Sequence, residues 1–369
     1  MRITFVTSVA FGGALESSNL LADRLAARGH EVEMIHGTRG HSMLKTFHRR
    51  AVNLSTKLSG TPLEDLSWWA ARHLRRSGAE RRSGAGVTVV AVDVPENEAM
   101  RRLGDGVDVV VGYSISRPAW RQILGRARVA GVPTVLYLRE DESLGHLDRP
   151  DAADRVVANA EVHARRARDK GYDATTIPSI IDRDRCRAET TRSVALLVNP
   201  IADYGVDVVL SLAEVLPEVR FVLQESWPLT GENLEVLEAR CRELPNLELR
   251  RFTSRIADVY RDAKVLLVPY GDDNRPRVVA EAQTNGIPVL GADRPGIAEV
   301  AGAGGVLVDP ASGLDVWERE LRRLWTDAAH YEELSRLARQ NSVAAERAED
   351  ALVDRFEEMV TELVGATSP

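Results

Sequence analysis

The chain has very little cysteine, few aromatic residues and no long apolar run. Its two cysteines, Cys186 and Cys241, are too few for a disulfide framework or a metal-ligand cluster, which agrees with a reducing compartment. No apolar run approaches the ~20 residues needed to cross a bilayer. The first residues, MRITFVTSVAFGG, are typical of a buried strand and a glycine turn rather than of a signal peptide. We therefore expect a cytoplasmic protein.

Other absences exclude whole classes of function. The formal net charge of -7 argues against a general nucleic-acid binder, because such proteins need a basic surface. No GxGxxG follows a strand, and the dense glycine cluster GAGG at 302–305 has the wrong spacing for a dinucleotide-binding turn. The GxxxxGK[ST] phosphate loop is missing as well, and no compact set of Asp, His and Cys is typical of a metal site. The sequence thus predicts neither a metal nor a cofactor.

The sequence does contain a regular alternation of short apolar runs and amphipathic stretches. With 369 residues, of which 44% are hydrophobic and 5% aromatic, the chain can build two cores that consist mostly of aliphatic side chains. The alternation is typical of parallel sheets wrapped by crossover helices. We predict an α/β fold of two Rossmann-like, doubly wound parallel-sheet domains that face each other across a cleft, with helices at the C-terminus.

The domain boundaries follow from a polar stretch, 182–193, that interrupts the alternation. The predicted domains are 1–182, 183–345 and a C-terminal helix, 346–369, that packs back across the domains. Beyond Pro310 the strands stop, and the predicted helices are 312–325, 328–341 and 344–364.

Residues 43–85 do not fit the alternation, and they carry many Lys and Arg residues together with Trp68 and Trp69. One interpretation is a helical insert that packs on its own domain and has a solvated basic face. The other is a surface for an anionic acceptor or a peripheral membrane contact, since basic helices with interfacial Trp behave in this way. Both interpretations stay open.

Residues 265–310, VLLVPYGDDNRPRVVAEAQTNGIPVLGADRPGIAEVAGAGGVLVDP, resemble the C-terminal donor-binding region of GT-B retaining glycosyltransferases, in particular those of family four. Four further segments extend the resemblance over most of the chain in the family's order: GG at 12–13, RGHEV at 28–32, IPSIID at 177–182 and GVDVVLSLAEVLPEVRFVL at 205–223. The resemblance implies the GT-B fold and sugar transfer from a nucleoside diphosphate to an acceptor hydroxyl.

The family's signature, two acidic residues separated by seven, falls on Asp273 and Glu281. A carboxylate one turn into a helix can accept both hydrogen bonds of a vicinal diol such as a ribose. The same helix start, 277–280, offers free N–H groups and a positive dipole end to a diphosphate. Asp273 stands where the family usually has Glu, and Pro276 where it usually has Gly. The predicted donor-binding residues are Gly12, Gly13, Asp273, Arg275, Pro276, Arg277, Val278 and Glu281.

A larger departure from the family lies at 198–206, VNPIADYGV. Relatives place there an Arg and a Lys that grip the donor diphosphate, whereas this chain has Pro200 and Tyr204. Neither residue is positively charged at neutral pH, so an active enzyme needs another cation. Arg277 is the favoured substitute, and Arg139, which closes the strand VLYLR, is expected to face the cleft. The predicted catalytic residues are Asp273, Arg277 and Arg139.

The candidates for acceptor binding are polar residues at two strand ends of the first domain. The segments GYSIS and LREDES supply Tyr113, Glu140 and Asp141. The acidic run would suit a cationic acceptor such as an aminocyclitol, although solvated loop acids are the commoner explanation. Relatives keep a histidine near the reacting sugar, and no histidine of this sequence is assigned to that place.

The resemblance implies a retaining, metal-independent enzyme that takes a nucleotide-sugar donor and a small-molecule or glycan acceptor, in natural-product or cell-envelope glycan synthesis. Retaining GT-B enzymes are thought to react on one face of the sugar, so no protein nucleophile is required. Two alternatives stay open. The missing Arg and Lys favour a non-catalytic nucleotide-binding or partner protein of the same fold, and an epimerase or pseudo-glycosyl coupling enzyme is the other.

Overall fold

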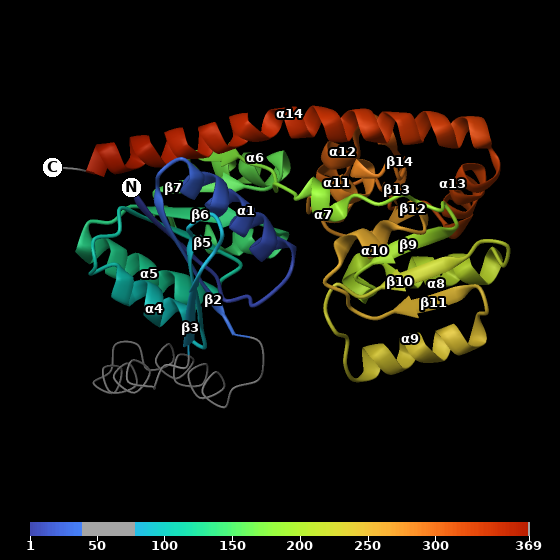
Figure 1. The fold of residues 1–369 in the computed structure, drawn as a ribbon, viewed down its shortest axis with the longest axis horizontal. Coiled ribbons are helices and arrows are strands. Elements are labelled where there is room, and N and C mark those ends of the chain that lie inside the picture. Colours follow the sequence, from blue (N-terminus) through green and yellow to red (C-terminus); the bar gives the residue numbers. More distant parts are fainter. Residues whose placement is uncertain (39–77, 368–369) are drawn as a thin grey trace. The chain divides into compact units, whose positions relative to one another are not determined.

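The computed structural model describes residues 1–38 and 78–367, and the chain divides into two compact units. The N-terminal unit comprises Met1–Ile180 and Ala351–Pro369, and the C-terminal unit comprises Ile181–Asp350. The division therefore falls after Ile180 rather than after residue 182, and after Asp350 rather than after residue 345. Figure 1 labels the elements of both units.

The N-terminal unit contains a sheet with the strand order β3-β4-β2-β1-β5-β6-β7-β8 (Figure 1). Its strands are β1 (Arg2–Val6), β2 (Glu31–Gly37), β3 (Gly78–Arg82), β4 (Thr88–Val92), β5 (Val109–Tyr113), β6 (Thr134–Leu138), β7 (Arg155–Ala158) and β8 (Ala174–Thr176). Neighbouring strands are parallel, apart from β3 and β4. The strands β2, β4 and β3 lie on one side of β1, and β5 to β8 lie on the other side. This reversal of strand order between β1 and β5 is that of a doubly wound fold.

Two apolar cores cover the two faces of this sheet. On one face, Phe5 packs with α1 and with Phe356, whose ring is stacked 6.0 Å from that of Phe5. On the other face, Val6 belongs to a core that contains Trp120 and apolar residues of α4, α5 and α6. The helices are α1 (Gly13–Ala27), α4 (Pro95–Arg102), α5 (Arg117–Ala130) and α6 (Glu161–Asp169). Strands that are buried on both faces read as continuous apolar runs, which is why the sequence predicted them.

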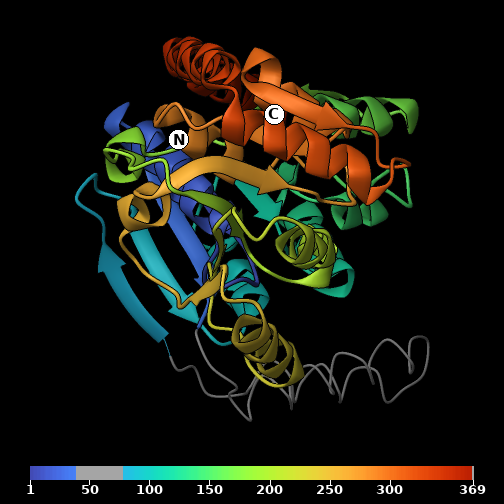
Figure 2. The ribbon, with the colours of Figure 1, turned by 90° about the vertical axis from the view of Figure 1, so that its right-hand side faces the viewer.

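The C-terminal unit has a parallel sheet with the strand order β11-β10-β9-β12-β13-β14. Its strands are β9 (Val194–Val198), β10 (Phe221–Gln224), β11 (Leu247–Arg250), β12 (Ala263–Val268), β13 (Val289–Ala292) and β14 (Gly305–Val308). Its helices are α7 (Arg183–Cys186), α8 (Val206–Val215), α9 (Glu232–Glu243), α10 (Ile256–Tyr260), α11 (Arg277–Thr284), α12 (Pro295–Ala301), α13 (Leu314–Thr326) and the first part of α14 (Ala328–Thr367). Within this unit, α9 and α14 lie on opposite sides (Figures 1 and 2).

Strand order in the second sheet reverses between β9 and β12. Ligands of such sheets bind outside the carboxyl ends of the strands, beside the reversal. The predicted α/β class with two Rossmann-like parallel sheets is thus confirmed, and the topology directs attention to the loops after β9 and β12.

Two predicted elements differ from the structure. Residues 78–82 belong to the stretch 43–85 that was predicted as a helical insert, but they form β3, which pairs antiparallel with β4. The segment GAERR has no apolar alternation, so only its pairing with β4 makes it a strand. The rest of the insert up to residue 77, with Trp68 and Trp69, lies outside the described residues.

The second difference concerns the C-terminal helices. The predicted helices 328–341 and 344–364 are one 40-residue helix, α14. Asn and Ser at the expected break favour turns in isolation, but here their side chains bond to distant parts of the C-terminal unit. Asn341 donates to Gln283 Oε1 at 2.6 Å and to the Val300 carbonyl at 2.9 Å, and Ser342 lies 3.2 Å from the Thr284 hydroxyl. The helix therefore continues through them.

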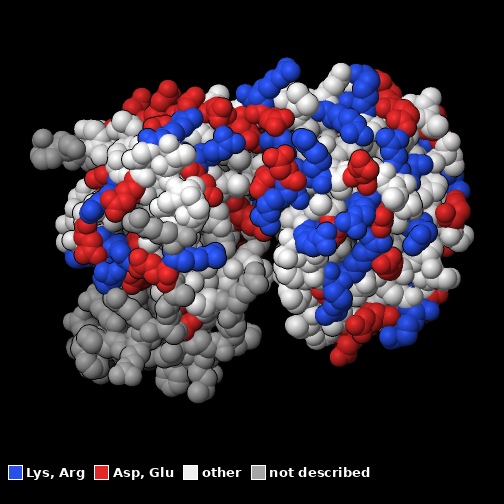
Figure 3. Space-filling view, in the orientation of Figure 1, with Lys and Arg blue, Asp and Glu red and all other residues white. Residues whose placement is uncertain are grey.

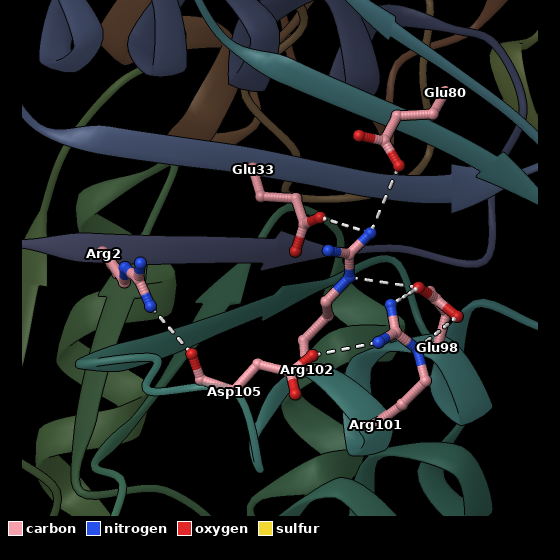
Figure 4. A network of polar contacts seen from close by, with 7 residues as sticks. All are labelled: Arg2, Glu33, Glu80, Glu98, Arg101, Arg102 and Asp105. Carbon is pink, nitrogen blue, oxygen red and sulfur yellow. Dashed lines mark hydrogen bonds and ion pairs between the residues drawn. The ribbon is translucent and has the colours of Figure 1, made fainter.

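A network of charged side chains lies at the edge of the first sheet (Figure 4). Arg102 on α4 contacts Glu33 Oε1 at 3.0 Å, Glu98 Oε1 at 3.1 Å and Glu80 Oε2 at 3.5 Å, and Arg101 contacts Glu98 at 2.5 Å. The Glu33 side chain is only 14% exposed. Burial raises the pKa of Glu33 to about 7, although the Arg102 charge opposes this rise.

Glu33→Gln should flatten the dependence of stability on pH. The pKa of Glu33 is raised above its ordinary value of 4.5, so the folded protein holds an extra proton between about pH 4.5 and pH 7. Stability is then lost as the pH rises through that window, on the order of 1–3 kcal/mol. Urea unfolding at pH 5 and pH 8 measures this loss. Glu31→Gln, an exposed change on the same strand, should lose as much stability between pH 5 and pH 8 as the unaltered protein. The same loss in Glu33→Gln would contradict a raised pKa at Glu33.

Candidate functional site

The loops after β9 and β12 touch at the carboxyl edge of the second sheet. Gly205, the N-cap of α8, has φ +72°, and a Cβ added to it would stand 2.3 Å from the Pro269 carbonyl oxygen. Only glycine tolerates both this conformation and this contact. The two loops on either side of the strand reversal are therefore held against each other by their backbones.

The loop 271–276 also lies against the start of α12. A Cβ on Gly296 would stand 2.3 Å from the Asp273 carbonyl oxygen and 2.4 Å from that of Asn274. The Asp272 carboxylate accepts from the Asn274 backbone N–H at 3.3 Å and from its side chain at 2.5 Å, which closes a tight turn. This packing fixes the backbone of Asp273, the first residue of the acidic pair. Gly296 was not among the predicted site residues.

Glu281 is a buried carboxylate in α11, 5% exposed, and both of its oxygens are bonded. Tyr260 donates its hydroxyl to Oε2 at 2.5 Å, and Arg277 Nε lies 2.7 Å from Oε1. Burial and the Glu281 charge raise the pKa of Tyr260 well above its ordinary value, so the phenol remains a donor. Each carboxylate oxygen can accept a second hydrogen bond. Tyr260 was missed in the sequence, because its bond to Glu281 spans 21 residues.

Three arginines lie at this edge of the sheet. Arg277 is paired with Glu281, and Arg275 is paired with Glu299 on α12, with Nε 3.3 Å from Oε1. Arg294 ends the short link between β13 and α12 and is half-buried. Within the part of the chain that the structure describes, Arg294 has no ion pair, and its buried Nε has no hydrogen-bond partner. The sequence signal for Arg294 was its place after a strand and directly before a Pro-Gly helix start.

Pro200 and Tyr204 occupy the two places where the family resemblance led us to expect cations. The Tyr204 ring packs on Tyr270, tilted by 40° with 4.5 Å between ring centroids, and meets Trp227 edge-on at 6.4 Å. The Tyr270 hydroxyl donates to the Val198 carbonyl at 3.2 Å. These rings follow β9, β10 and β12, while Pro200 is buried. Residues 200 and 204 therefore supply packing and no charge.

In the N-terminal unit, the carboxyl edge of the sheet carries the glycine turn and Arg139. Gly12 has φ +106°, and a Cβ added to it would meet nothing within 4 Å, while Gly13 begins α1. Arg139 is 5% exposed and was expected to be open to ligands. It donates to Ser18 at 2.7 Å and to Ser179 at 3.1 Å, and its guanidinium lies 3.6 Å from the Tyr137 ring centroid. None of the described carboxylates forms an ion pair with Arg139.

The three residues predicted for acceptor binding are engaged inside the N-terminal unit. Tyr113 is fully buried, and burial raises the pKa of its hydroxyl. Glu140 accepts from the Ser114 hydroxyl at 3.2 Å, and burial raises its pKa. Asp141 Oδ1 lies 2.8 Å from His163 Nε2 and 2.9 Å from Arg166 Nη1. The ring of Tyr113 has no open surface for an acceptor, whereas Glu140 and Asp141 are partly exposed.

The structure thus gathers Asp273, Arg275, Pro276, Arg277, Val278 and Glu281 at one helix start, and adds Tyr260, Arg294 and Gly296 to them. Pro276 is the N-cap of α11 and makes no side-chain cap hydrogen bond, while the Val279 N–H donates to the Pro276 carbonyl at 3.2 Å. Gly12, Gly13, Tyr113 and Arg139 share the carboxyl edge of the other sheet.

Residues 195–327 match the sequence profile of the family described as glycosyl transferases group 1. No curated protein matches the chain by sequence. The matched segment contains the whole edge around Glu281, from β9 to α13.

Solved structures resemble the chain over its full length. The sucrose-phosphate synthase of Thermosynechococcus elongatus is 13% identical with a TM-score of 0.71, covering 99% of this chain and 100% of that one. Anabaena HepE in complex with UDP and glucose is 15% identical with a TM-score of 0.69, covering 98% and 100%. The pneumococcal O-GlcNAc transferase GtfA in complex with UDP and GlcNAc is 10% identical with a TM-score of 0.65, covering 99% of each chain. At these identities the likeness shows the fold, which is the GT-B fold.

Two searches of the described residues gave negative results. Within 1–38 and 78–367, no helix has both the length and the apolar character required to traverse a bilayer. The same residues contain no group of three or more His, Cys, Asp and Glu side chains arranged to hold a metal ion.

Gly296→Ala should displace the loop that carries Asp273. The added methyl would stand 2.3 Å from a backbone oxygen, so the loop must move, and the free energy of unfolding should fall by on the order of 1–3 kcal/mol. Urea unfolding measures the change. Gly365→Ala in α14, where the methyl meets nothing within 4 Å, is the matched control and should be neutral or stabilising. Equal stability of Gly296→Ala and the unaltered protein would contradict the close packing of this loop.

Proposed function

We propose that this protein is a retaining glycosyltransferase that moves a sugar from a nucleoside-diphosphate sugar to an acceptor hydroxyl. The profile match over residues 195–327, the GT-B fold, and neighbours solved with UDP or UDP-glucose support sugar transfer. We further propose that it acts in the cytoplasm without a metal ion, on a small-molecule or glycan acceptor of natural-product or cell-envelope glycan synthesis.

The observation that carries the proposal is the placement of Glu281. Its carboxylate is buried one turn into α11, a helix whose N-terminus has no side-chain cap, and Tyr260 holds Oε2. In the proposed complex the ribose diol donates to the two carboxylate oxygens, while the Tyr260 bond stays. Arg277 leaves Oε1 and turns to the diphosphate, which lies at the helix start. The Glu281 carboxylate then recognises the ribose and the start of α11 recognises the diphosphate, the two groups common to nucleoside-diphosphate sugars.

Positive charge near the diphosphate decides whether transfer is fast. Pro200 and Tyr204 provide none, so we propose that Arg277 and Arg294 stabilise the negative charge that develops on the leaving diphosphate. Arg139, buried without an ion pair to any of the described carboxylates, favours a negatively charged group close to it, and the turn at Gly12 and Gly13 would let a phosphate approach the backbone. Asp273 is proposed to orient the hydroxyls of the donor sugar.

Retention follows from reaction on one face of the sugar. The bond from the anomeric carbon to the diphosphate oxygen breaks, and a bond from that carbon to the acceptor oxygen forms on the same face. The departing phosphate oxygen takes the acceptor's proton, so no side chain has to act as a nucleophile. Helix dipole and arginines supply the charge that a metal ion supplies elsewhere.

Glu281→Gln and Glu281→Ala should weaken nucleotide binding roughly ten- to hundredfold, since charge-assisted hydrogen bonds to the ribose are lost. A thermal-shift screen with UDP, GDP, ADP and dTDP identifies the nucleotide first, because a ligand that binds the folded state raises the melting temperature. Glu333→Ala, which removes an exposed ion pair on α14, is the control and should keep the shift. Normal binding by both Glu281 variants would place the site elsewhere.

Arg294→Gln should lower the affinity for UDP by roughly tenfold and leave the affinity for uridine unchanged, because its proposed partner is the diphosphate. Calorimetric titration with both ligands measures the two constants, and Arg294→Lys should recover part of the loss. Arg255→Gln, an exposed change at the N-cap of α10, serves as the control. An equal loss for UDP and uridine would show that Arg294 acts only on the structure of the loop.

The lack of positive charge at Pro200 and Tyr204 favours one other candidate function. In it, the protein has the same fold and binds a nucleotide but transfers no sugar. This candidate predicts a normal nucleotide shift together with no turnover across a broad panel of donors and acceptors.

A further inference from the structure

The N-terminal unit has a basic groove that the proposed reaction does not use. It lies between α5, the short helix η1 (Asp141–His146) and the loop 147–152, and encloses a cavity of about 80 Å³. We define the basic groove by Arg117, Arg121, Arg128 and Arg149, with Asp148 and Asp151 between them. All six residues line the cavity.

The basic groove owes its charge to one stripe of α5. This helix carries four arginines and no acidic residue. Arg117, Arg121 and Arg128 are spaced so that they lie within about 40° of one another around the helix and extend over about 16 Å along it. Figure 3 draws one face of the molecule, on which Lys and Arg side chains lie among Asp and Glu side chains. In the basic groove, three arginines of one helix stripe stand together with Arg149.

The two aspartates neutralise only half of this charge. Asp148 lies 2.6 Å from Arg121 and 4.0 Å from Arg117, while Asp151 lies 2.8 Å from Arg128 and 3.7 Å from Arg149. Four guanidinium groups against two carboxylates leave two positive charges. Burial lowers the pKa of His146, which also lines the cavity, so the imidazole does not remove that excess and adds none near neutral pH.

The groove is also preorganised for binding. Trp120 donates its indole N–H to the Ala152 carbonyl at 2.8 Å, Lys170 donates to the Leu147 carbonyl at 3.2 Å, and Arg117 donates to the Gly145 carbonyl at 3.3 Å. The first bond holds the loop against α5, the second ties the loop to the end of α6, and the third ties η1 to α5. The four arginine side chains remain between 49% and 61% exposed, so their remaining N–H donors are accessible. Fixed, accessible guanidinium forks match the oxygens of phosphate and sulfate groups.

We propose that the basic groove binds the phosphate or sulfate groups of an anionic glycan. The cavity holds a single tetrahedral oxyanion, and the line of arginines continues beyond it, which suits a chain that carries several such groups at intervals. A membrane surface fits less well, because Val129 is the strongly exposed large apolar side chain of α5 and a lipid contact needs several. The choice of a glycan as the carrier of these groups rests on the proposed transferase function, whereas the excess positive charge of the groove does not.

Arg121→Gln tests the proposal, with Arg126→Gln as the matched control. Both changes remove one charge from α5, but Arg126 lies about 140° from Arg121 around the helix, outside the groove. Calorimetric titration of the intact protein uses a sulfated oligosaccharide, a phosphodiester-linked oligosaccharide and inorganic phosphate at two salt concentrations. We expect Arg121→Gln to weaken binding of at least one oligosaccharide about tenfold and Arg126→Gln to change it less than twofold.

The outcomes separate the sources of the anion. Preference for one oligosaccharide, with loss in Arg121→Gln, identifies sulfate or phosphodiester as the group that is bound. Equal losses in both variants, binding of inorganic phosphate as tight as that of either oligosaccharide, or binding of anionic phosphatidylglycerol vesicles without binding of either glycan would overturn the proposal. The nucleotide thermal shift of Arg121→Gln should equal that of the unaltered protein. Failure of the proposed nucleotide site is thereby distinguished from failure of the proposed glycan site.

Discussion

The carboxylate of Glu281, buried and held between a tyrosine hydroxyl and an arginine, is the interaction on which the edge of the C-terminal unit depends. A buried charge is stable only when it is hydrogen-bonded and paired. Tyr260 and Arg277 meet both requirements, and they also fix α10 and the start of α11 relative to each other. The loop that carries Asp273 is in turn pressed on α12 through Gly296, so the acidic pair is set by backbone packing rather than by flexible side chains.

This edge has exchanged charge for aromatic packing. Tyr204 packs with Trp227 and Tyr270, and Tyr204 and Pro200 stand at the two positions where the resemblance implied cations. Rings stabilise the strand ends, but they do not stabilise a developing negative charge. In the proposed reaction the positive charge comes from the other side of the reversal, where Arg277 is tied to its own carboxylate and Arg294 has no ion pair among the described residues. The proposed chemistry is consistent with this layout only if these arginines face the diphosphate.

The N-terminal unit is built differently. Its polar residues at the carboxyl edge mostly bond to one another: Arg139 to serines, Glu140 to Ser114, and Asp141 to His163 and Arg166. Among the described residues, these bonds satisfy the polar groups of the edge from within the unit, and Arg139 is buried there. Strong surface charge lies instead along α5, outside that edge.

The sequence by itself determined the two parallel sheets, most strand positions and the place of Glu281. Strands buried on both faces must be apolar throughout, and a carboxylate just inside a helix after a strand is visible as a pattern. Only the tertiary structure decided that GAERR becomes β3, that α14 runs through Asn341 and Ser342, that Tyr260 holds Glu281, and that Arg139 is buried. Periodicity records which face of a segment is buried. The last three features depend on partners 21 or more residues away in the sequence. GAERR has no apolar alternation and becomes a strand by pairing with the nearby β4, so no apolar pattern specifies it.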